Sequence, residues 1–336
     1  MSLPEPRANP ELFGHEAAEA MLADAIRAGR LHHAWLITGP EGIGKATLAY
    51  RFARRLLAGV PSGHSLALPA DHPVFRRVAA GSHADLLTVE RAWDEKKKRL
   101  RGEIVIEHAR AVTGFLHRTA AEGGWRVVVV DGCENLNRSA ANALLKMLEE
   151  PPPRAILLLV ASSTGSLPPT IASRCRRLML APLDDPAMQQ VVGRLLPDLD
   201  DAARARLIAL ADGSPGRAAM LAESGGLGAA DLVDKVLTAQ DRGTVLQAHA
   251  IADTLGRDET AFSTFMTLLR AAIAAAVRDA AAGRADPDQA RLLGNRPLDA
   301  WVEAWETLGQ LQDATEDAYL DKRQAVVTGL ALLRAT

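Results

Sequence analysis

The sequence predicts an α/β domain with a parallel sheet, followed by a helical remainder. Three observations support this prediction. Strand-like and helix-like segments alternate over the first half of the 336 residues. A glycine-rich turn, GPEGIGKA, directly follows the first apolar strand-like run. After Pro182 the chain becomes rich in alanine, and its apolar residues recur at helical spacing with almost no strand signal.

The predicted strands of the first half are short apolar runs. They lie at 33–38, 125–132, 155–163 and 176–183. Helices are predicted at 45–59 and 139–150, because their apolar residues recur every three or four positions. Gly59 is expected to end the first of these helices and Ser139 to cap the start of the second.

The predicted elements divide the chain into three parts. Residues 1–183 are expected to form the α/β domain, residues 184–226 a small helical domain, and residues 227–336 an all-helical domain. The short helices of the middle part are expected to break at Pro197, at Gly213 and around Gly225. In the last part, one long helix is predicted over 262–283, and Trp301 and Trp305 are expected to share a face of another helix as core or interface residues.

Composition limits the class of protein. The net charge of −2 is that of a chain not built to coat nucleic acid, so any such contact must come from a local patch. Two cysteines, Cys133 and Cys175, are too few for a disulfide framework or a four-cysteine zinc site. The N-terminal residues lack the order of a signal peptide, and the apolar run 155–161 is too short to span a bilayer. We therefore expect a soluble cytoplasmic protein without a membrane segment.

The turn after the first strand matches a phosphate-binding loop in all but one position. Gly39, Gly42 and Gly44 provide the flexible backbone, and Lys45 provides a positive charge at the start of a helix. Ala46 stands where a serine or threonine hydroxyl normally binds Mg²⁺. The loop keeps the parts that bind phosphate groups but lacks one of the usual ligands of Mg²⁺, so the sequence leaves open whether it holds a nucleotide.

A second nucleotide-site position follows the strand 125–132. Asp131 ends this strand, where an aspartate helps to hold Mg²⁺ in P-loop ATPases. Many such ATPases have a water-activating glutamate immediately after it, but this chain has Gly132. Glu134 is expected to serve the following loop instead. Two separate parts of the hydrolytic machinery are therefore missing.

Three sequence blocks carry a family resemblance. They are HAWLITGPEGIGKATLA, VVVVDGCENLNRSAANALLKMLEEPP and LLLVASSTGSLPPTIASRC, in this order. Together they resemble the AAA+ clamp-loader subunits of bacterial DNA polymerase III, and NALLKMLEEPP with SRC is specific to that family. The resemblance implies an AAA+ domain, a helical lid and a helical collar that joins five subunits. It also implies as partners the tau/gamma and delta subunits, and through the complex the sliding clamp and primer-template DNA.

Carried over to this chain, the resemblance gives roles to three further residues. Arg174 of the SRC motif would be an arginine finger that acts on the ATP of a neighbouring subunit. Ser162 falls at the sensor-1 position, and Arg217 lies near the sensor-2 position. Because of Ala46 and Gly132, the chain resembles the non-hydrolysing member of the family, with no ATPase or polymerase activity of its own.

Two alternatives remain open. The first is an active tau/gamma-type ATPase that uses Lys45, Asp131 and Glu134. The second is an unrelated P-loop kinase or recombination helicase subunit, which the family-specific strings disfavour. No cofactor is expected to be required, although ATP or ADP bound without hydrolysis is compatible with the loop.

Two segments outside these motifs are candidates for a metal site and for a DNA contact. Many clamp-loader subunits carry a four-cysteine zinc module after the first helix, but residues 60–83 contain no cysteine. His64, His72 and His83 are scattered without ligand spacing, so no zinc is expected. The basic run 93–103 can contact DNA phosphates, but a solvated hairpin or loop tip is favoured, because acidic residues flank the run.

Overall fold

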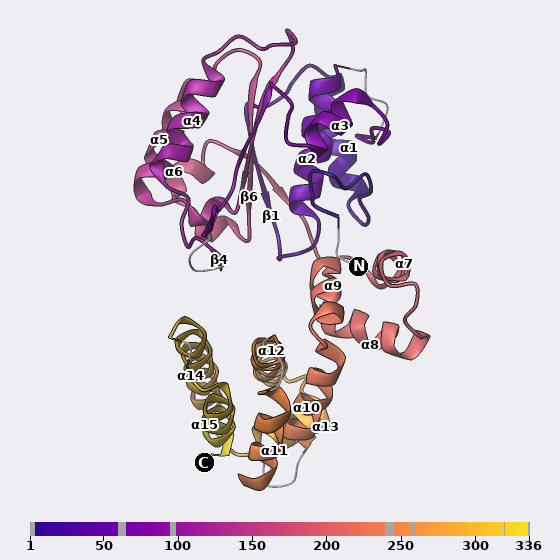
Figure 1. Cartoon of the computed structure of the whole chain (residues 1–336), viewed down its shortest axis with the longest axis vertical. Coiled ribbons are helices and arrows are strands. Elements are labelled where there is room, and N and C mark those ends of the chain that lie inside the picture. The colour runs from indigo at the N-terminus through magenta and orange to yellow at the C-terminus, as the bar shows by residue number, and fades with distance from the viewer. Residues whose placement is uncertain are drawn as a thin grey trace. The chain divides into compact units, whose positions relative to one another are not determined.

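The chain folds into two compact units. The computed structural model describes residues 4–59, 65–94, 99–238, 245–256, 260–318 and 320–334. The first unit consists of Met1–Asp200 and Ile208–Ala219, and the second of Asp201–Leu207 and Met220–Thr336 (Figure 1). The finer division of the helices after residue 183 into a lid and a collar stays a prediction.

The first unit is built on a five-stranded parallel sheet in the order β2-β5-β6-β1-β7. The strands are β1 Ala34–Thr38, β2 Leu86–Val89, β5 Arg126–Asp131, β6 Ala155–Ala161 and β7 Arg176–Met179. The four predicted strands are confirmed. β2 has no counterpart among them, because this short edge strand buries only its last residue and lacks the continuous apolar run of the central strands.

Helices cover both faces of this sheet. They are α1 Glu16–Arg27, α2 Lys45–Ala58, α3 Pro73–Ala79, α4 Ile106–Leu116, α5 Arg138–Glu149 and α6 Pro169–Ala172. α1, α2 and α3 lie on one side of the sheet and α4, α5 and α6 on the other (Figure 1). The apolar core on the α4–α6 side takes alternate residues of the central strands. On the other side the rings of Trp35 and Phe52 meet edge to face, 6.0 Å apart.

The ends of two helices test the predicted caps. α2 ends as predicted, since Gly59 adopts the left-handed conformation with φ 62°. Ser139 is not the cap of α5, and that prediction is wrong. The side chain of Asn137 accepts a hydrogen bond from the backbone N–H of Ala140 at 2.9 Å, so the cap lies two residues before the predicted one. Asn and Ser are about equally good caps, so composition alone does not choose between them.

Three short helices follow the last strand. They are α7 Asp185–Leu195, α8 Asp201–Ala211 and α9 Pro215–Glu223. Their breaks fall at Pro197 and Gly213 as predicted. Asp184 caps α7 by accepting a hydrogen bond from the backbone N–H of Ala187 at 3.0 Å.

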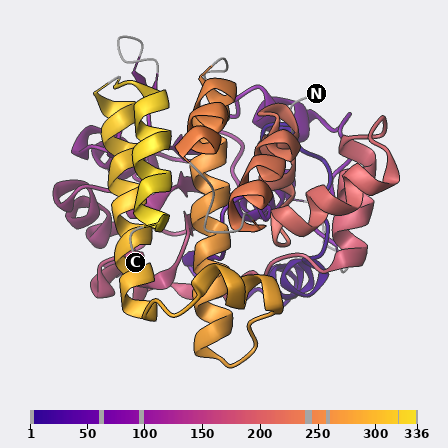
Figure 2. The same cartoon turned by 90° about the horizontal axis from the view of Figure 1, so that it is seen from below.

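The second unit is a group of helices arranged around α12. It contains α10 Gly226–Thr238, α11 Val245–Leu255, α12 Ala261–Ala281, α13 Pro287–Leu293, α14 Leu298–Asp317 and α15 Lys322–Arg334. α12 packs against α10, α11, α13 and α14, and α14 lies beside α15 (Figure 2). Trp301 on α14 is fully buried, whereas the ring of Trp305 is covered by the Arg270 guanidinium at 4.4 Å. Both tryptophans therefore pack within the unit.

The long helix α12 has the length and composition of a membrane span. Its most apolar 18-residue window has a mean hydropathy of 1.3. Its buried face carries Phe262, Phe265, Leu269 and Ile273, which pack against the neighbouring helices. Burial of such a face is typical of the core helix of a helical bundle, which passes the same length and hydropathy test.

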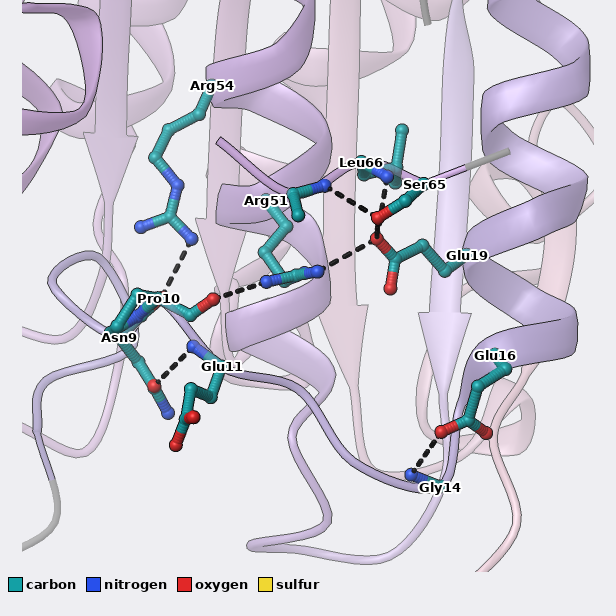
Figure 3. Close-up of polar contacts among 11 residues, drawn as sticks. Asn9, Pro10, Glu11, Gly14, Glu16, Glu19, Arg51, Arg54, Ser65 and Leu66 are labelled. Carbon is teal, nitrogen blue, oxygen red and sulfur yellow. Dashed lines mark hydrogen bonds and ion pairs between the residues drawn. The ribbon is translucent and has the colours of Figure 1, made fainter. Parts of the chain in front are cut away.

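A buried ion pair joins α1 to α2 (Figure 3). Nη2 of Arg51 lies 2.8 Å from Oε1 of Glu19, and the two side chains are 7% and 12% exposed. The same carboxylate oxygen accepts hydrogen bonds from the Ser65 hydroxyl at 2.9 Å and from the backbone N–H of Leu66 at 2.6 Å. Glu19 therefore fixes the chain where it returns after α2.

Two arginines of α2 also hold the N-terminal segment (Figure 3). Arg51 donates to the carbonyl of Pro10. Arg54 donates to the carbonyls of Arg7 at 3.1 Å and Asn9 at 2.8 Å, and its guanidinium lies over the Phe75 ring at 4.3 Å. The residues before α1 are thus tied to the helix that follows the glycine loop.

Replacement of Glu19 by alanine is expected to destabilise the first unit by about 3–5 kcal/mol, because it leaves the buried Arg51 guanidinium without its anion. Glu16→Ala on the same helix is the matched control. Glu16 is exposed and, among the described residues, accepts only from the backbone N–H of Gly14, so its loss should change stability by less than about 1 kcal/mol. Urea denaturation followed by circular dichroism measures both, and equal effects would contradict the role of Glu19.

Candidate functional site

The loop between β1 and α2 is held in the conformation of a phosphate-binding turn. Gly39, Gly42 and Gly44 have φ of +145°, +75° and +104°, values that favour glycine. A Cβ atom on Gly39 would lie 2.4 Å from the carbonyl oxygen of Leu180, and one on Gly42 would lie 2.5 Å from the Ser214 hydroxyl. These positions therefore require glycine for two reasons: the backbone conformation, and the close packing that leaves no room for a Cβ atom at Gly39 and Gly42.

Lys45 is almost buried at the start of α2. Its Nζ donates a hydrogen bond to the carbonyl of Pro40, within the loop itself, at 2.6 Å. Burial lowers the pKa of Lys45, and the carboxylates of Glu134, Asp131 and Glu41 oppose that shift. The lysine is thus bound to its own loop and surrounded by negative charge.

A cleft of about 940 Å³ opens beside Lys45 at the C-terminal ends of β5 and β6. Five carboxylates and three cations line it: Glu5, Glu41, Glu90, Asp131 and Glu134, with Arg7, Lys45 and Arg91. Burial raises the pKa of Asp131, and the charge of Glu90 raises it further. A cleft in which anions outnumber cations is a poor environment for a polyphosphate without a metal ion.

Glu134 points into this cleft, so the prediction that it serves the following loop is wrong. Gly132 adopts a left-handed conformation with φ 70° and begins a short 3₁₀ helix, Cys133–Asn135. That turn brings Oε1 of Glu134 to the backbone N–H of Ser162, which donates to it at 3.0 Å. Oε2 is buried and has no hydrogen-bond partner among the described residues. Sequence separation alone does not reveal this reversal of the chain, and the glycine is its only signal.

The structure brings the predicted nucleotide-site residues to one edge of the sheet. Lys45, Asp131 and Ser162 line the cleft. Gly42 and Gly44 line an adjoining pocket of about 550 Å³, which Lys45 and Asp131 also reach. Gly39 begins the loop behind them. Ala46 offers no hydroxyl to a metal ion. The ligand that the sequence lacks is therefore not replaced at that position.

The start of α9 packs directly on the loop, a contact that the sequence does not predict. The Ser214 hydroxyl donates to the carbonyl of Glu41 at 2.8 Å, and the backbone N–H of Gly216 donates to the carbonyl of Gly42 at 2.9 Å. A Cβ atom on Gly216 would lie 2.7 Å from Cα of Gly42. The backbone N–H of Arg217 donates to the Ser214 hydroxyl at 3.1 Å, while Arg217 lines neither cavity described above.

Arg174 lies at the opposite edge of the sheet. β7 runs parallel to β1, with Arg176 paired to Trp35 and Met179 paired to Thr38. The glycine loop follows the end of β1, whereas Arg174 precedes the start of β7. At about 3.3 Å per residue, the two are separated by about 15–20 Å along the strands. Arg174 is therefore too far away to contact the phosphate loop of its own chain.

The Arg174 guanidinium is held at the surface by two helix ends. α6 stops after one turn, and the arginine follows Ser173 at its C-terminus. Nη1 of Arg174 donates to the carbonyl of Thr170 at 3.0 Å, and Nη2 lies 2.7 Å from Oε1 of Glu149 at the end of α5. The side chain is 37% exposed. The neighbouring Cys175 donates its thiol to the Ile171 carbonyl, and burial raises its pKa to about 11, as expected of an unreactive thiol.

The histidines after α2 that the structure describes lie in positions that do not form a metal site. His72 caps α3 by accepting from the backbone N–H of Val74 at 3.2 Å, and the side chain of His83 is fully buried. His64 lies outside the described residues. Within the described ranges, no three histidine, cysteine, aspartate or glutamate residues gather as metal ligands. The absence of zinc stays a prediction.

The basic run forms a hairpin, as predicted. Its strands β3 Trp93–Asp94 and β4 Arg99–Leu100 pair antiparallel. The three lysines at 96–98 lie outside the part of the chain that the structure describes.

Comparisons with known proteins place this site in a family context. The sequence profile of the family described as DNA polymerase III, delta subunit, matches residues 14–184, about half of the chain. The delta' subunit of Pseudomonas aeruginosa is 38% identical over 184 residues, which are 54% of this chain and 53% of that protein. The delta' subunit of Escherichia coli K12 is 36% identical over 201 residues, 60% of this chain and 57% of that protein. The chain thus matches little more than half the length of these relatives.

More distant similarities extend to other proteins. The tau/gamma subunit of Haemophilus influenzae is 29% identical over 218 residues, 62% of this chain and 29% of that protein. A solved DNA polymerase III gamma subunit-related protein from Thermotoga maritima is 17% identical with a TM-score of 0.46, covering 94% of this chain and 98% of that one.

Replacement of Glu134 by glutamine is expected to raise the affinity for ADP about threefold to tenfold, because it removes a negative charge beside Lys45. Titration of a fluorescent ADP analogue without Mg²⁺ measures the change. Glu41→Gln is the matched control. Its carboxylate is exposed and influences Lys45 less, so a smaller increase is expected. An affinity that does not change in Glu134→Gln would contradict the electrostatic role of Glu134.

Proposed function

Because the chain belongs to the DNA polymerase III delta-subunit family, we propose that it serves as the delta' subunit of a bacterial clamp loader. In this role it is a rigid, cytoplasmic member of a heteropentamer with tau/gamma and delta subunits. The assembly opens the sliding clamp and places it on primer-template DNA. The similarity of the α/β unit to delta' subunits supports this role, and the helical second unit would supply the contacts between subunits.

The observation that carries the mechanism is the distance between Arg174 and the glycine loop. An exposed guanidinium at the opposite edge of the sheet can act only on a phosphate that another molecule supplies. In a ring of subunits, it would lie against the ATP of the neighbour and stabilise negative charge on the transferring phosphoryl group. Arginines of this kind typically contribute about 10³–10⁵ in rate.

Two features of the cleft support the absence of ATP hydrolysis in the chain itself. Ala46 provides no hydroxyl for Mg²⁺, and Gly132 provides no base. The carboxylates around Lys45 further disfavour a triphosphate. The residues present do not fit a hydrolysing Mg²⁺–nucleotide site.

One observation favours the alternative of an active tau/gamma-type ATPase. Glu134 points into the cleft near Asp131 and Lys45, and its buried Oε2, which has no partner in the described part of the chain, could accept a proton. Its other oxygen, however, is bound to the Ser162 N–H. No residue replaces the hydroxyl missing at Ala46, so the structural role of Glu134 is the better supported.

The purified chain is expected to hydrolyse ATP no faster than a buffer blank, because the magnesium ligand and the base are both missing. A phosphate-release assay with Mg²⁺ measures the rate. Lys45→Ala should give the same background. Turnover that disappears in Lys45→Ala would overturn the proposal and favour the tau/gamma-type ATPase.

Arg174→Ala is expected to lower ATP hydrolysis at the neighbouring site of the reconstituted loader about 10³-fold or more. The assay measures phosphate release by the loader in the presence of clamp and DNA. Total turnover should fall by the share that this neighbouring site contributes. Arg174→Lys is the conservative control and should restore little, since lysine lacks the planar fork of donors. Circular dichroism and gel filtration check folding and assembly. Full stimulated turnover with Arg174→Ala would exclude an arginine finger.

A further inference from the structure

Glu149 makes the one ion pair that Arg174 forms within the described residues. It is the last residue of α5, and its Oε1 lies 2.7 Å from Nη2 of Arg174. The other terminal nitrogen, Nη1, donates to the carbonyl of Thr170 at 3.0 Å. Both terminal nitrogens of the guanidinium are therefore bound by this chain itself.

The same two nitrogens are those with which an arginine binds a phosphate group as a fork. The Glu149 carboxylate and a phosphate are both anionic acceptors for the same donors. A phosphate bound to Nη2 would also lie close to the Glu149 carboxylate, and the two like charges would repel each other. Glu149 and the neighbour's phosphate therefore compete for the guanidinium.

The exposure of the pair allows this exchange. The Arg174 and Glu149 side chains are 37% and 48% exposed, so water screens their attraction and the pair contributes little to stability. A triphosphate carries several negative charges, and its bidentate contact with arginine is stronger than a single exposed carboxylate contact. The Thr170 carbonyl is neutral, so it opposes the approach of a phosphate far less than the carboxylate does.

We propose that Glu149 is a positioning residue that holds the Arg174 guanidinium on its own chain until a phosphate of the neighbouring subunit displaces it. This inference rests on the proposed function, because it takes Arg174 to act on a neighbour's ATP. Release of Glu149 then becomes part of the closure that starts hydrolysis. The carboxylate keeps the basal rate low before clamp and DNA bind.

The test uses the full reconstituted loader with Glu149→Gln in this subunit. ATP hydrolysis without clamp or DNA should rise about twofold to fivefold, the range expected for loss of one exposed ion pair. The maximal rate with clamp and DNA should stay unchanged, because Glu149 is already displaced in that state. A purely structural role would not produce this split between basal and maximal rates.

Glu150→Gln is the matched control. Glu150 is the next residue along, is exposed, and makes no ion pair with Arg174 in the described part of the chain. The substitution removes the same charge and should change neither rate. A basal rate in Glu149→Gln that is unchanged, lowered, or raised equally by Glu150→Gln would overturn the proposal.

A second measurement needs no partner subunit. In the isolated full chain, NMR of the ¹⁵N-labelled arginine side chains should show faster rotation of the Arg174 guanidinium in Glu149→Gln than in the wild type. An unchanged rotation rate would show that Glu149 does not hold the guanidinium, and the proposal would fail.

The double variant Glu149→Gln, Arg174→Ala separates this inference from the proposed function. If both hold, it should lose the raised basal rate. If Arg174→Ala leaves hydrolysis unchanged in the wild-type background, the proposed function fails. If Arg174→Ala acts as expected while Glu149→Gln does not, the inference about Glu149 alone fails.

Discussion

The parallel direction of the five strands determines where the candidate site residues and Arg174 lie. Residues that follow strands gather at one edge of the sheet, and residues that precede strands gather at the other. Lys45 comes after the loop that follows β1, Asp131 ends β5 and Ser162 follows β6, so these three residues line one cleft. Arg174 precedes β7 and lies at the far edge with the end of α5. The chain therefore has two different faces, which would suit the ring proposed above, in which each interface joins unlike edges.

Much of the first unit follows from local sequence. The central strands are continuous apolar runs because they are buried on both faces, and the glycine loop identifies the β1–α2 junction. The edge strand β2 cannot be predicted in this way, because only its last residue is buried. The cap of α5 cannot be predicted either, because Asn137 and Ser139 are similar cap residues. Where two choices have nearly equal local free energies, tertiary packing decides.

The sequence predicts which residues belong to the candidate site, but it does not predict the contacts that these residues make. The loop glycines, Lys45 and Asp131 are recognisable by spacing after strands. The inward turn of Glu134 depends on the left-handed conformation of Gly132, and the packing of α9 on the loop joins residues far apart in the sequence. Such contacts arise from the close approach of two backbones at Gly42 and Gly216, which composition and periodicity do not encode.

The position of Glu19 has a consequence for how this protein can change during evolution. The chain leaves α2 at Gly59 and is fixed again at Ser65 and Leu66 by the Glu19 carboxylate. Both ends of the intervening segment are thus anchored independently of what lies between them. Insertions or deletions between two anchored points change the loop-closure entropy only slowly with length. A change in the length of the chain between Gly59 and Ser65 is therefore compatible with an undisturbed sheet.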